Sequence, residues 1–193
     1  MENLSDRLAG LPIDKRKQIE LLLRERLRQN RELIPRREGS KAARLSFAQE
    51  RLWFLQQLYP RLVAYNESSA YLFKGELDLE ALEDSINLLF KRHEILRSKF
   101  SEISGAPYQT AQSYQNQILQ CDDLSSLSQV ERLPIARERI KGEIDRPFEF
   151  QQDLMLRAKV YRLDSQEHIL LLVRHHIVSD GWSARLMIEE IIR

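Results

Sequence analysis

The 193-residue sequence has a single cysteine, Cys121, and no long hydrophobic run. One cysteine can form neither a disulfide within the chain nor a cysteine zinc cluster, which is typical of a reducing compartment, so we expect a cytoplasmic location. The longest aliphatic run, Ile169 to Val173, is far shorter than the roughly 20 residues that cross a bilayer. We therefore expect no membrane-spanning helix, and the acidic first residues predict no secretion signal.

Glycine and proline are also scarce, with six residues of each, whereas 42% of the residues are hydrophobic. This composition excludes collagen-like and disordered chains and predicts a globular protein with a sizeable core. The chain is longer than a typical domain of about 150 residues. We expect one domain with an appendage, or part of a larger protein.

A surplus of one charge is missing as well, because 30 lysines and arginines nearly balance 29 acids. The distribution is uneven, since residues 1–44 hold twelve basic and seven acidic residues and the remainder is acidic. No aromatic residue precedes Phe47, which favours a solvated helix face over nucleic-acid binding for this basic segment. Contact with an acidic protein stays open, and we expect neither a nucleic acid nor a membrane as partner.

A linker is predicted at Pro35 to Lys41, where proline, glycine, serine and charged residues come together. Before it, apolar residues at helical spacing predict a short helix and then a longer one over about residues 14–31. We expect residues 1–40 to form a helical linker or docking segment and residues 41–193 to form the main domain.

Helical and strand-like patterns alternate along the main domain and predict an α/β fold with a mixed sheet covered by helices. The strand at residues 168–174 is apolar on both faces, as central strands are, whereas the strand at residues 154–161 alternates and predicts one buried face. The predicted helices cover residues 46–59, 78–93, 128–144 and the last residues up to 193, and the other predicted strands cover residues 65–75, 96–103 and 108–112.

Capping and turn residues support these boundaries. Ser46 and Gln49 have the spacing of a capping box, and Asp78 can cap the helix that follows it. The sequence SGAP at residues 104–107 predicts a hairpin turn. Pro134 predicts a fresh helix start with the proline in the first turn.

Polar residues gather directly after the central strand, at His175, His176, Asp180 and Gly181. Sites of α/β folds lie at the carboxyl ends of such strands. Packing alone offers one interpretation, with one histidine in the core, Asp180 as a helix cap and Gly181 in a turn. A metal site is disfavoured, because neighbouring histidines on a strand point to opposite faces.

A chemical interpretation assigns one histidine as general base, or as hydrogen-bond acceptor, for an attacking nucleophile. Asp180, if it is buried and ionised, needs a cationic partner, and Gly181 lets backbone donors approach an oxyanion. No serine in a G-x-S-x-G elbow precedes this segment, and Cys121 lies elsewhere without a neighbouring base. These features favour direct transfer between two bound substrates over a covalent acyl-enzyme.

Motifs in the same order resemble those of the condensation domains of nonribosomal peptide synthetases. The HHxxxDG signature of that family matches residues 175–181. Residues 46–55 (SFAQERLWFL) look like the first family motif, and residues 92–100 (RHEILRSKF) look like the second, with Ser98 where threonine is usual. The resemblance extends over about residues 45–192, and the ordered set is more specific than any single motif.

The resemblance implies a chloramphenicol acetyltransferase-like sandwich lobe, with a mixed, largely antiparallel sheet flanked by helices and an N-terminal helical extension. Family members have two such lobes with a catalytic tunnel between them. We therefore expect the chain to be the N-terminal lobe, with the C-terminal lobe absent and the isolated fragment inactive.

The activity that the resemblance implies is peptide-bond formation by an acyltransferase. The amine of an acceptor aminoacyl thioester on a downstream carrier protein attacks a donor thioester on an upstream carrier protein. Both substrates are held on the phosphopantetheine of the carriers, so no cofactor bound directly to this chain is expected. Residues 1–40 are a candidate contact for an upstream synthetase.

The resemblance also implies roles for single residues. His176 is the catalytic histidine, either as base or by positioning the amine, and His175 shapes the site. Asp180 is mainly structural, in a salt bridge for which Arg92 is the first candidate and Arg97 the second. Gly181 keeps space for the substrates.

Two other functions stay open. One is an acyltransferase of the same fold that uses acyl-coenzyme A, which the motifs at residues 46–55 and 92–100 disfavour. The other is a non-catalytic module that docks a carrier protein, in which the basic residues meet an acidic partner.

Ordinary packing is the expected role of several other conspicuous residues. Trp53, Phe54 and Leu55 form an aromatic and aliphatic run within a capped helix and are expected in the core. His93 lies on an apolar helix face and is expected to be a buried histidine. Cys121 is expected to be a passive residue beside a loop.

Overall fold

The computed structural model describes residues 15, 17, 21 and 42–192. The chain divides into two units, Met1–Gly39 and Ser40–Arg193. The helices, linker and docking role predicted for residues 1–41 lie outside the described residues, apart from the three isolated positions. All elements below therefore belong to the second unit.

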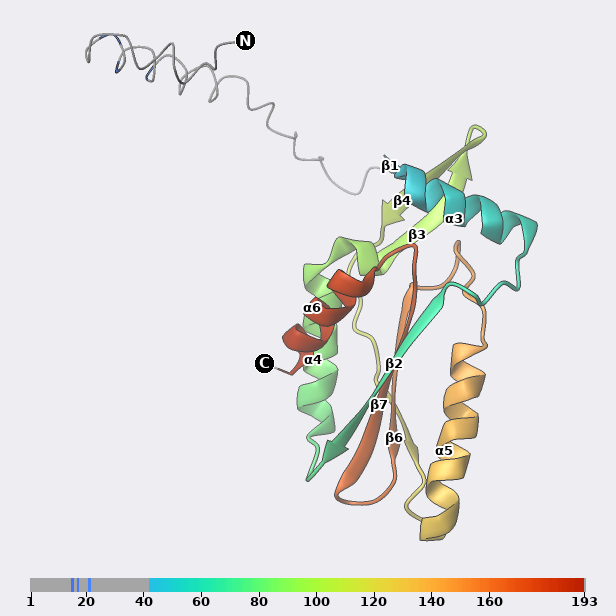
Figure 1. The fold of residues 1–193 in the computed structure, drawn as a ribbon, viewed down its shortest axis with the longest axis vertical. Coiled ribbons are helices and arrows are strands. Elements are labelled where there is room, and N and C mark those ends of the chain that lie inside the picture. The colour runs from blue at the N-terminus through green and yellow to red at the C-terminus, as the bar shows by residue number, and fades with distance from the viewer. Residues whose placement is uncertain (1–14, 16, 18–20, 22–41, 193) are drawn as a thin grey trace, which may run out of the picture. The chain divides into compact units, whose positions relative to one another are not determined.

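A four-stranded sheet forms the centre of this unit (Figure 1). Its strands pair in the order β2 (Asn66–Lys74), β7 (Glu167–His175), β6 (Leu156–Arg162) and β5 (Gln120–Asp123). β7 is antiparallel to both of its neighbours, whereas β5 runs parallel to β6. Every residue of β7 after Glu167 is buried, because a central strand covered on both faces exposes neither.

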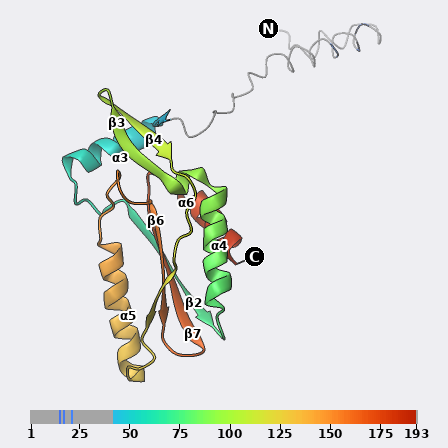
Figure 2. The same cartoon turned by 180° about the vertical axis from the view of Figure 1, so that it is seen from behind.

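Helices cover the two faces of this sheet. α5 (Gln129–Ile144) lies on one face, and α4 (Leu79–Arg92) and α6 (Gly181–Ile191) lie together on the other, as the two opposite views show (Figures 1 and 2). The predicted cap of α4 is confirmed, since a carboxylate oxygen of Asp78 accepts hydrogen bonds from the backbone N–H groups of Glu80 and Ala81, both at 3.0 Å.

A smaller sheet with the strand order β1 (Ala43–Arg44), β4 (Ala106–Ala111) and β3 (Ser98–Ile103) lies beside α3 (Phe47–Leu58) (Figure 2). The short helix η1 (Glu94–Arg97) joins α4 to β3. The predicted hairpin turn is confirmed: Ser104 and Gly105 connect β3 to β4 with φ angles of 53° and 78°. Positive φ at both turn residues matches the right-handed twist of the strands.

The predicted fold class is confirmed, because both sheets are flanked by helices and all strand pairs except β5–β6 are antiparallel. The capping box at Ser46 and Gln49 is also present, with both reciprocal hydrogen bonds formed. No helix in the part of the chain that the structure describes is long and apolar enough to cross a membrane.

Two local predictions are wrong. Pro134 lies in the second turn of α5 rather than the first, because Ser128 and Glu131 form the capping box that starts the helix earlier. β6 buries residues on both faces, since α5 covers its second face and Tyr161 on that face is fully buried. Alternation therefore located the strand correctly but underestimated its burial.

The short strands β1 and β5 were not predicted. Each is at most four residues long and mainly polar, so neither shows the period-two hydrophobic pattern of a half-buried strand. Cys121 lies within β5 and is exposed, rather than beside a loop.

Candidate functional site

The end of β7 carries the two neighbouring histidines to opposite faces of the sheet. His175 is the last residue of β7, opposite Asn66, and the backbone N–H of His176 continues the ladder by donating to the carbonyl of Tyr65 at 2.9 Å. Because successive side chains of a strand point to opposite faces, the two imidazoles meet different surroundings.

His175 lies in the aromatic core. It is 1% exposed, and the rings of Phe148 and Phe150 meet its imidazole edge-on, with centroids 6.0 and 4.8 Å away. Its Nδ1 accepts a hydrogen bond from the backbone N–H of Ile177 at 3.1 Å. Burial lowers the pKa of His175 to about 4, so the ring is neutral at neutral pH. This is the core histidine that the packing interpretation proposed.

Acid should destabilise the protein partly through His175. The unfolded chain takes up a proton at this residue below its ordinary pKa of 6.5, whereas the folded protein does so only near 4. We expect this histidine to lower the free energy of unfolding by about 1.4 kcal/mol per pH unit as the pH falls through that interval.

The comparison variant is His175→Asn, whose amide oxygen retains an acceptor for the N–H of Ile177. Urea unfolding of both proteins at pH 7 and pH 4.5 cancels the contribution of carboxylates that they share. The wild type should lose more stability than the variant between the two pH values. Equal losses in the two proteins would show that His175 does not titrate as its burial implies.

His176 lies on the other face and is accessible. Its side chain is 42% exposed and lines an open groove of about 550 Å³ between the start of α3 and the start of α6. Its Nδ1 lies 2.9 Å from Oε1 of Glu67, a residue of β2. Among residues 42–192, no hydrogen bond or ion pair uses Nε2 of His176, so this nitrogen is free to meet a substrate.

Glu67 connects His176 to two further residues, and sequence reasoning missed it. Its Oε2 forms an ion pair with Nε of Arg174 at 3.2 Å and accepts a hydrogen bond from Oγ of Ser179 at 3.3 Å. Arg174 is 8% exposed, and its Nη1 also donates to Oγ of Ser69 at 3.2 Å. The signal in the sequence is an acid inside a strand, but only the strand register places it beside His176.

The loop after His176 is held by the first helix of the domain. Nε2 of Gln49 donates to the carbonyl of Ile177 at 3.1 Å, while Oε1 of the same amide accepts from the backbone N–H of Ser46 at 3.0 Å. Gln49 therefore belongs both to the cap of α3 and to the wall of the groove.

Asp180 is the N-cap of α6 and is exposed. Its Oδ1 accepts hydrogen bonds from the backbone N–H and the hydroxyl of Ser183, at 2.8 and 2.9 Å. These hydrogen bonds hold the pKa of Asp180 below its usual value.

The expected salt bridge of Asp180 is absent from the described residues. Arg92 instead pairs with Glu190, with Nη1 and Oε1 3.5 Å apart, and Arg97 pairs with Glu94, with Nη2 and Oε1 3.8 Å apart. The physical reason is that the carboxylate of Asp180 turns toward the first backbone N–H groups of α6, so it needs no buried cation.

Substitution of Asp180 should separate capping from charge pairing. Asp180→Ala removes the cap and should lower the melting temperature by a few degrees, whereas Asp180→Asn should stay near the wild type because asparagine caps equally well. Thermal unfolding of the three proteins measures the difference. If Asp180→Asn is as unstable as Asp180→Ala, the charge matters and the capping explanation fails.

Gly181 is the first residue of α6, and a Cβ added there would have no heavy atom within 4 Å among the described residues. Neither backbone conformation nor packing within the described residues requires glycine at this position. Its expected role, space for substrates, stays a prediction.

Other expected residues differ in their outcome. Trp53 is buried as predicted, but Phe54 is 60% exposed, because only one side of α3 packs against the domain. His93 ends α4 with its side chain 38% exposed, and its Nε2 lies 2.9 Å from Oε2 of Glu190. The prediction of a buried histidine is wrong here because the carboxylate of α6 takes the place of apolar packing.

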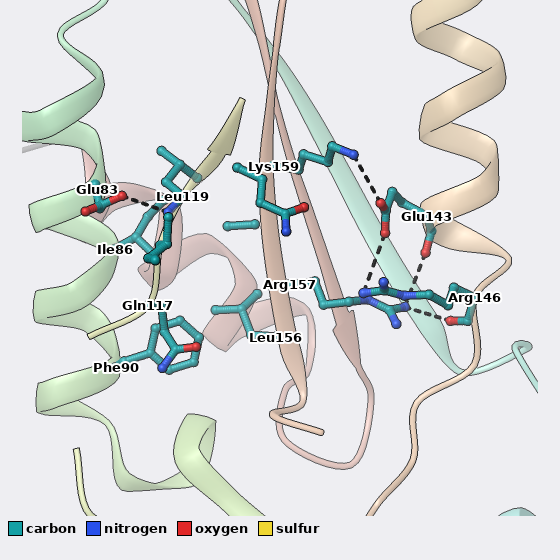
Figure 3. Close-up of a pocket in the computed structure, with 13 residues that line it drawn as sticks. Glu83, Ile86, Phe90, Gln117, Leu119, Glu143, Arg146, Leu156, Arg157 and Lys159 are labelled. Atoms are coloured by element: carbon teal, nitrogen blue, oxygen red, sulfur yellow. Dashed lines mark hydrogen bonds and ion pairs between the residues drawn. The ribbon is translucent and has the colours of Figure 1, made fainter. Parts of the chain in front are cut away.

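A second cavity, of about 190 Å³, lies between α4, β6 and α5 (Figure 3). Nζ of Lys159 pairs with Oε1 of Glu143 at 3.4 Å, and Nη2 of Arg157 donates to the carbonyl of Arg146 at 2.7 Å. Burial lowers the pKa of Arg157 to about 10. None of the residues predicted for the site lines this cavity, and within the described residues no group of three or more His, Cys, Asp or Glu could hold a metal ion.

Comparison with known proteins places these observations in a family context. The family model of the condensation domain matches residues 40–193. One linear gramicidin synthase protein of Brevibacillus parabrevis is 41% identical over 148 residues, which cover 77% of this chain and 2% of that protein. Surfactin synthase subunit 2 of Bacillus subtilis (strain 168) is 36% identical over 147 residues, which cover 76% of this chain and 4% of that protein.

Solved structures have the same fold. The first condensation domain of the calcium-dependent antibiotic synthetase, in complex with a substrate analogue, is 27% identical with a TM-score of 0.71. The starter condensation domain of rhizomide synthetase is 20% identical with a TM-score of 0.73. Each match covers 79% of this chain and 36% of the solved chain. The chain thus spans about a third of the solved chains and a few per cent of the curated relatives.

Proposed function

Because this chain belongs to the condensation-domain family of nonribosomal peptide synthetases, we propose that the groove at His176 is part of a site for peptide-bond formation. The single observation that carries the proposal is the state of His176. Its ring is anchored through Nδ1 at the end of the central strand, while Nε2 remains free in a groove of about 550 Å³. A histidine held in this way is suited to accept a proton or to position an amine.

In the proposed reaction, the amine nitrogen of the acceptor attacks the carbonyl carbon of the donor thioester. The new C–N bond forms, the C–S bond breaks, and the donor acyl group passes to the acceptor. Nε2 of His176 accepts the proton that the amine loses and returns it to the departing thiolate of the upstream carrier. No covalent intermediate with the protein is needed, since the acceptor amine is itself the nucleophile.

We propose that both substrates arrive as thioesters on the phosphopantetheine of carrier proteins, upstream for the donor and downstream for the acceptor. His175 would then hold the wall of the site from the core, and Gly181 would leave room at the start of α6. The remainder of a condensation domain would cover the groove as a second lobe, in keeping with the 36% of the solved chains that this chain spans. We place the reaction in the cytoplasm and assign residues 1–40 as a contact for an upstream synthetase.

The test uses the complete condensation domain with two purified carrier proteins, each loaded with an aminoacyl thioester. Mass spectrometry of the intact acceptor carrier should show the dipeptidyl thioester. A parallel reaction offers the same donor acyl group on coenzyme A without a donor carrier, and it should give little product. Efficient transfer from coenzyme A together with no transfer from the carrier would contradict the proposal and favour an acyl-coenzyme A-dependent enzyme.

A further inference from the structure

We propose that Glu67 is a positioning residue that fixes the tautomer and the orientation of His176. This inference rests on the proposed function of His176. Its starting point is the strand register, in which Glu67 of β2 lies directly opposite Arg174 of β7. His176 follows Arg174 by two residues and continues the same ladder through Tyr65, so the three side chains project from one face of the sheet.

The start of β2 is itself held in place, which makes the position of Glu67 definite. Nδ2 of the preceding residue, Asn66, donates to the carbonyls of Ile144 and Arg146 at 2.7 and 3.0 Å, where α5 ends. Because Asn66 points to the α5 face, Glu67 points to the opposite one, toward His176.

The contact with Glu67 determines which imidazole nitrogen carries the proton. A carboxylate only accepts hydrogen bonds, so Nδ1 of His176, 2.9 Å from Oε1 of Glu67, must be the protonated nitrogen of the neutral ring. The lone pair is then on Nε2, the nitrogen free to meet the amine. Without the carboxylate, the ring could rotate or adopt the other tautomer, in which Nε2 cannot accept a proton.

The remaining partners of Glu67 keep it in the required state. Arg174 and Ser179 both contact Oε2, at 3.2 and 3.3 Å, which leaves Oε1 for His176. The nearly buried guanidinium of Arg174 favours the ionised carboxylate, which in turn stabilises the imidazolium that forms when Nε2 takes a proton. Arg174, Glu67 and His176 thus form a connected series from the core to the groove.

The chain contains a matched pair that lacks this role. His93 and Glu190 also approach to 2.9 Å, but there the contact uses Nε2, and His93 lies outside the groove. The variant Glu190→Gln therefore removes a histidine–carboxylate contact of the same length without touching the proposed site. It serves as the control for Glu67→Gln.

The first measurement is the rate of dipeptide formation by the complete condensation domain. Glu67→Gln should lower the rate by about 10- to 100-fold, the usual effect of losing a group that orients a functional histidine. Glu190→Gln should leave the rate unchanged. In the His176→Ala background, Glu67→Gln should have no further effect, because there is no ring left to position. An equal loss in both backgrounds would overturn the proposal and indicate a purely structural role.

The second measurement does not depend on activity. Nitrogen-15 NMR of histidine-labelled protein, with His176 assigned by its absence in His176→Ala, should show Nδ1 protonated in the wild type and a shift toward the other tautomer in Glu67→Gln. An unchanged tautomer would overturn the proposal. If the tautomer shifts but His176→Ala forms dipeptide at the normal rate, the proposed function fails while the Glu67–His176 contact stands.

A second variant keeps the test decisive if Glu67→Gln fails to fold. Glu67→Asp retains the charge beside Arg174 but withdraws the carboxylate from Nδ1 by one methylene group. It should fold, lose part of the rate and show a mixed tautomer population. A full rate with an unchanged tautomer in this variant would contradict the need for the close contact.

Discussion

Replacing His176 with alanine should lower the rate of dipeptide formation by about 10²- to 10⁴-fold, the usual contribution of a positioned general base. The imidazole is the group that places a free nitrogen, Nε2, in the groove at the end of the central strand. Its loss should affect the chemical step much more than folding, because the side chain is 42% exposed and packs little. Single-turnover assays with preloaded carriers measure the step directly.

The matched control is His93→Ala. His93 is similarly exposed, at 38%, and also contacts a glutamate, but it lies at the end of α4 outside the groove. Its loss should leave the rate unchanged. Dipeptide formation at equal rates in wild type and His176→Ala would contradict the role assigned to His176, whatever the control shows.

Replacing Phe150 with alanine should lower the free energy of unfolding by about 3–5 kcal/mol, as expected for truncating a buried aromatic side chain. Phe150 is 4% exposed and lies at the centre of an aromatic cluster. Its ring centroid is 6.0 Å from that of Trp53, 5.6 Å from that of Phe100 and 4.8 Å from that of His175. The cavity left behind would separate α3, the small sheet and the wall of the site.

Urea unfolding, with the slope of the transition compared between variants, measures this loss. Phe54→Ala is the control, because it removes the same ring from a position that is 60% exposed, and it should change stability by less than about 0.5 kcal/mol. A loss for Phe150→Ala no larger than that of the control would show that the cluster does not hold the domain together.

Strong periodic patterns and caps were the reliable signals in this sequence. The aliphatic run of β7 predicted a central buried strand, and the spacing of Ser46 and Gln49 predicted the start of α3. Both depend on residues close together in the chain. The same holds for the turn at Ser104 and Gly105, whose conformation is set by local backbone geometry.

Features that depend on distant partners were not predictable in this way. Glu67 is 109 positions before His176 and meets it only because β2 pairs with β7 in one particular register. A shift of one residue would turn Glu67 to the other face of the sheet. β5 is likewise defined by its pairing with β6 rather than by its own polar sequence.

Asp180 shows how chemical expectation and local geometry can diverge. An acid in a motif after a buried strand suggests a charge that needs a cation, but the first turn of α6 offers unpaired N–H groups at the same place. The packing interpretation, which assigned Asp180 as a helix cap, described the structure correctly. For His176, by contrast, packing alone does not explain an exposed ring held through one nitrogen.

The amide of Gln49 has a consequence for recombination between related domains. Its oxygen serves the cap of α3, and its NH₂ group holds the loop after His176, so one side chain joins segments 128 positions apart. Glutamate at this position would preserve the cap but could not donate to the carbonyl of Ile177. A chimera with its crossover anywhere between these segments takes the two halves of that contact from different parents. Compatibility at this single amide is therefore a criterion for choosing the crossover.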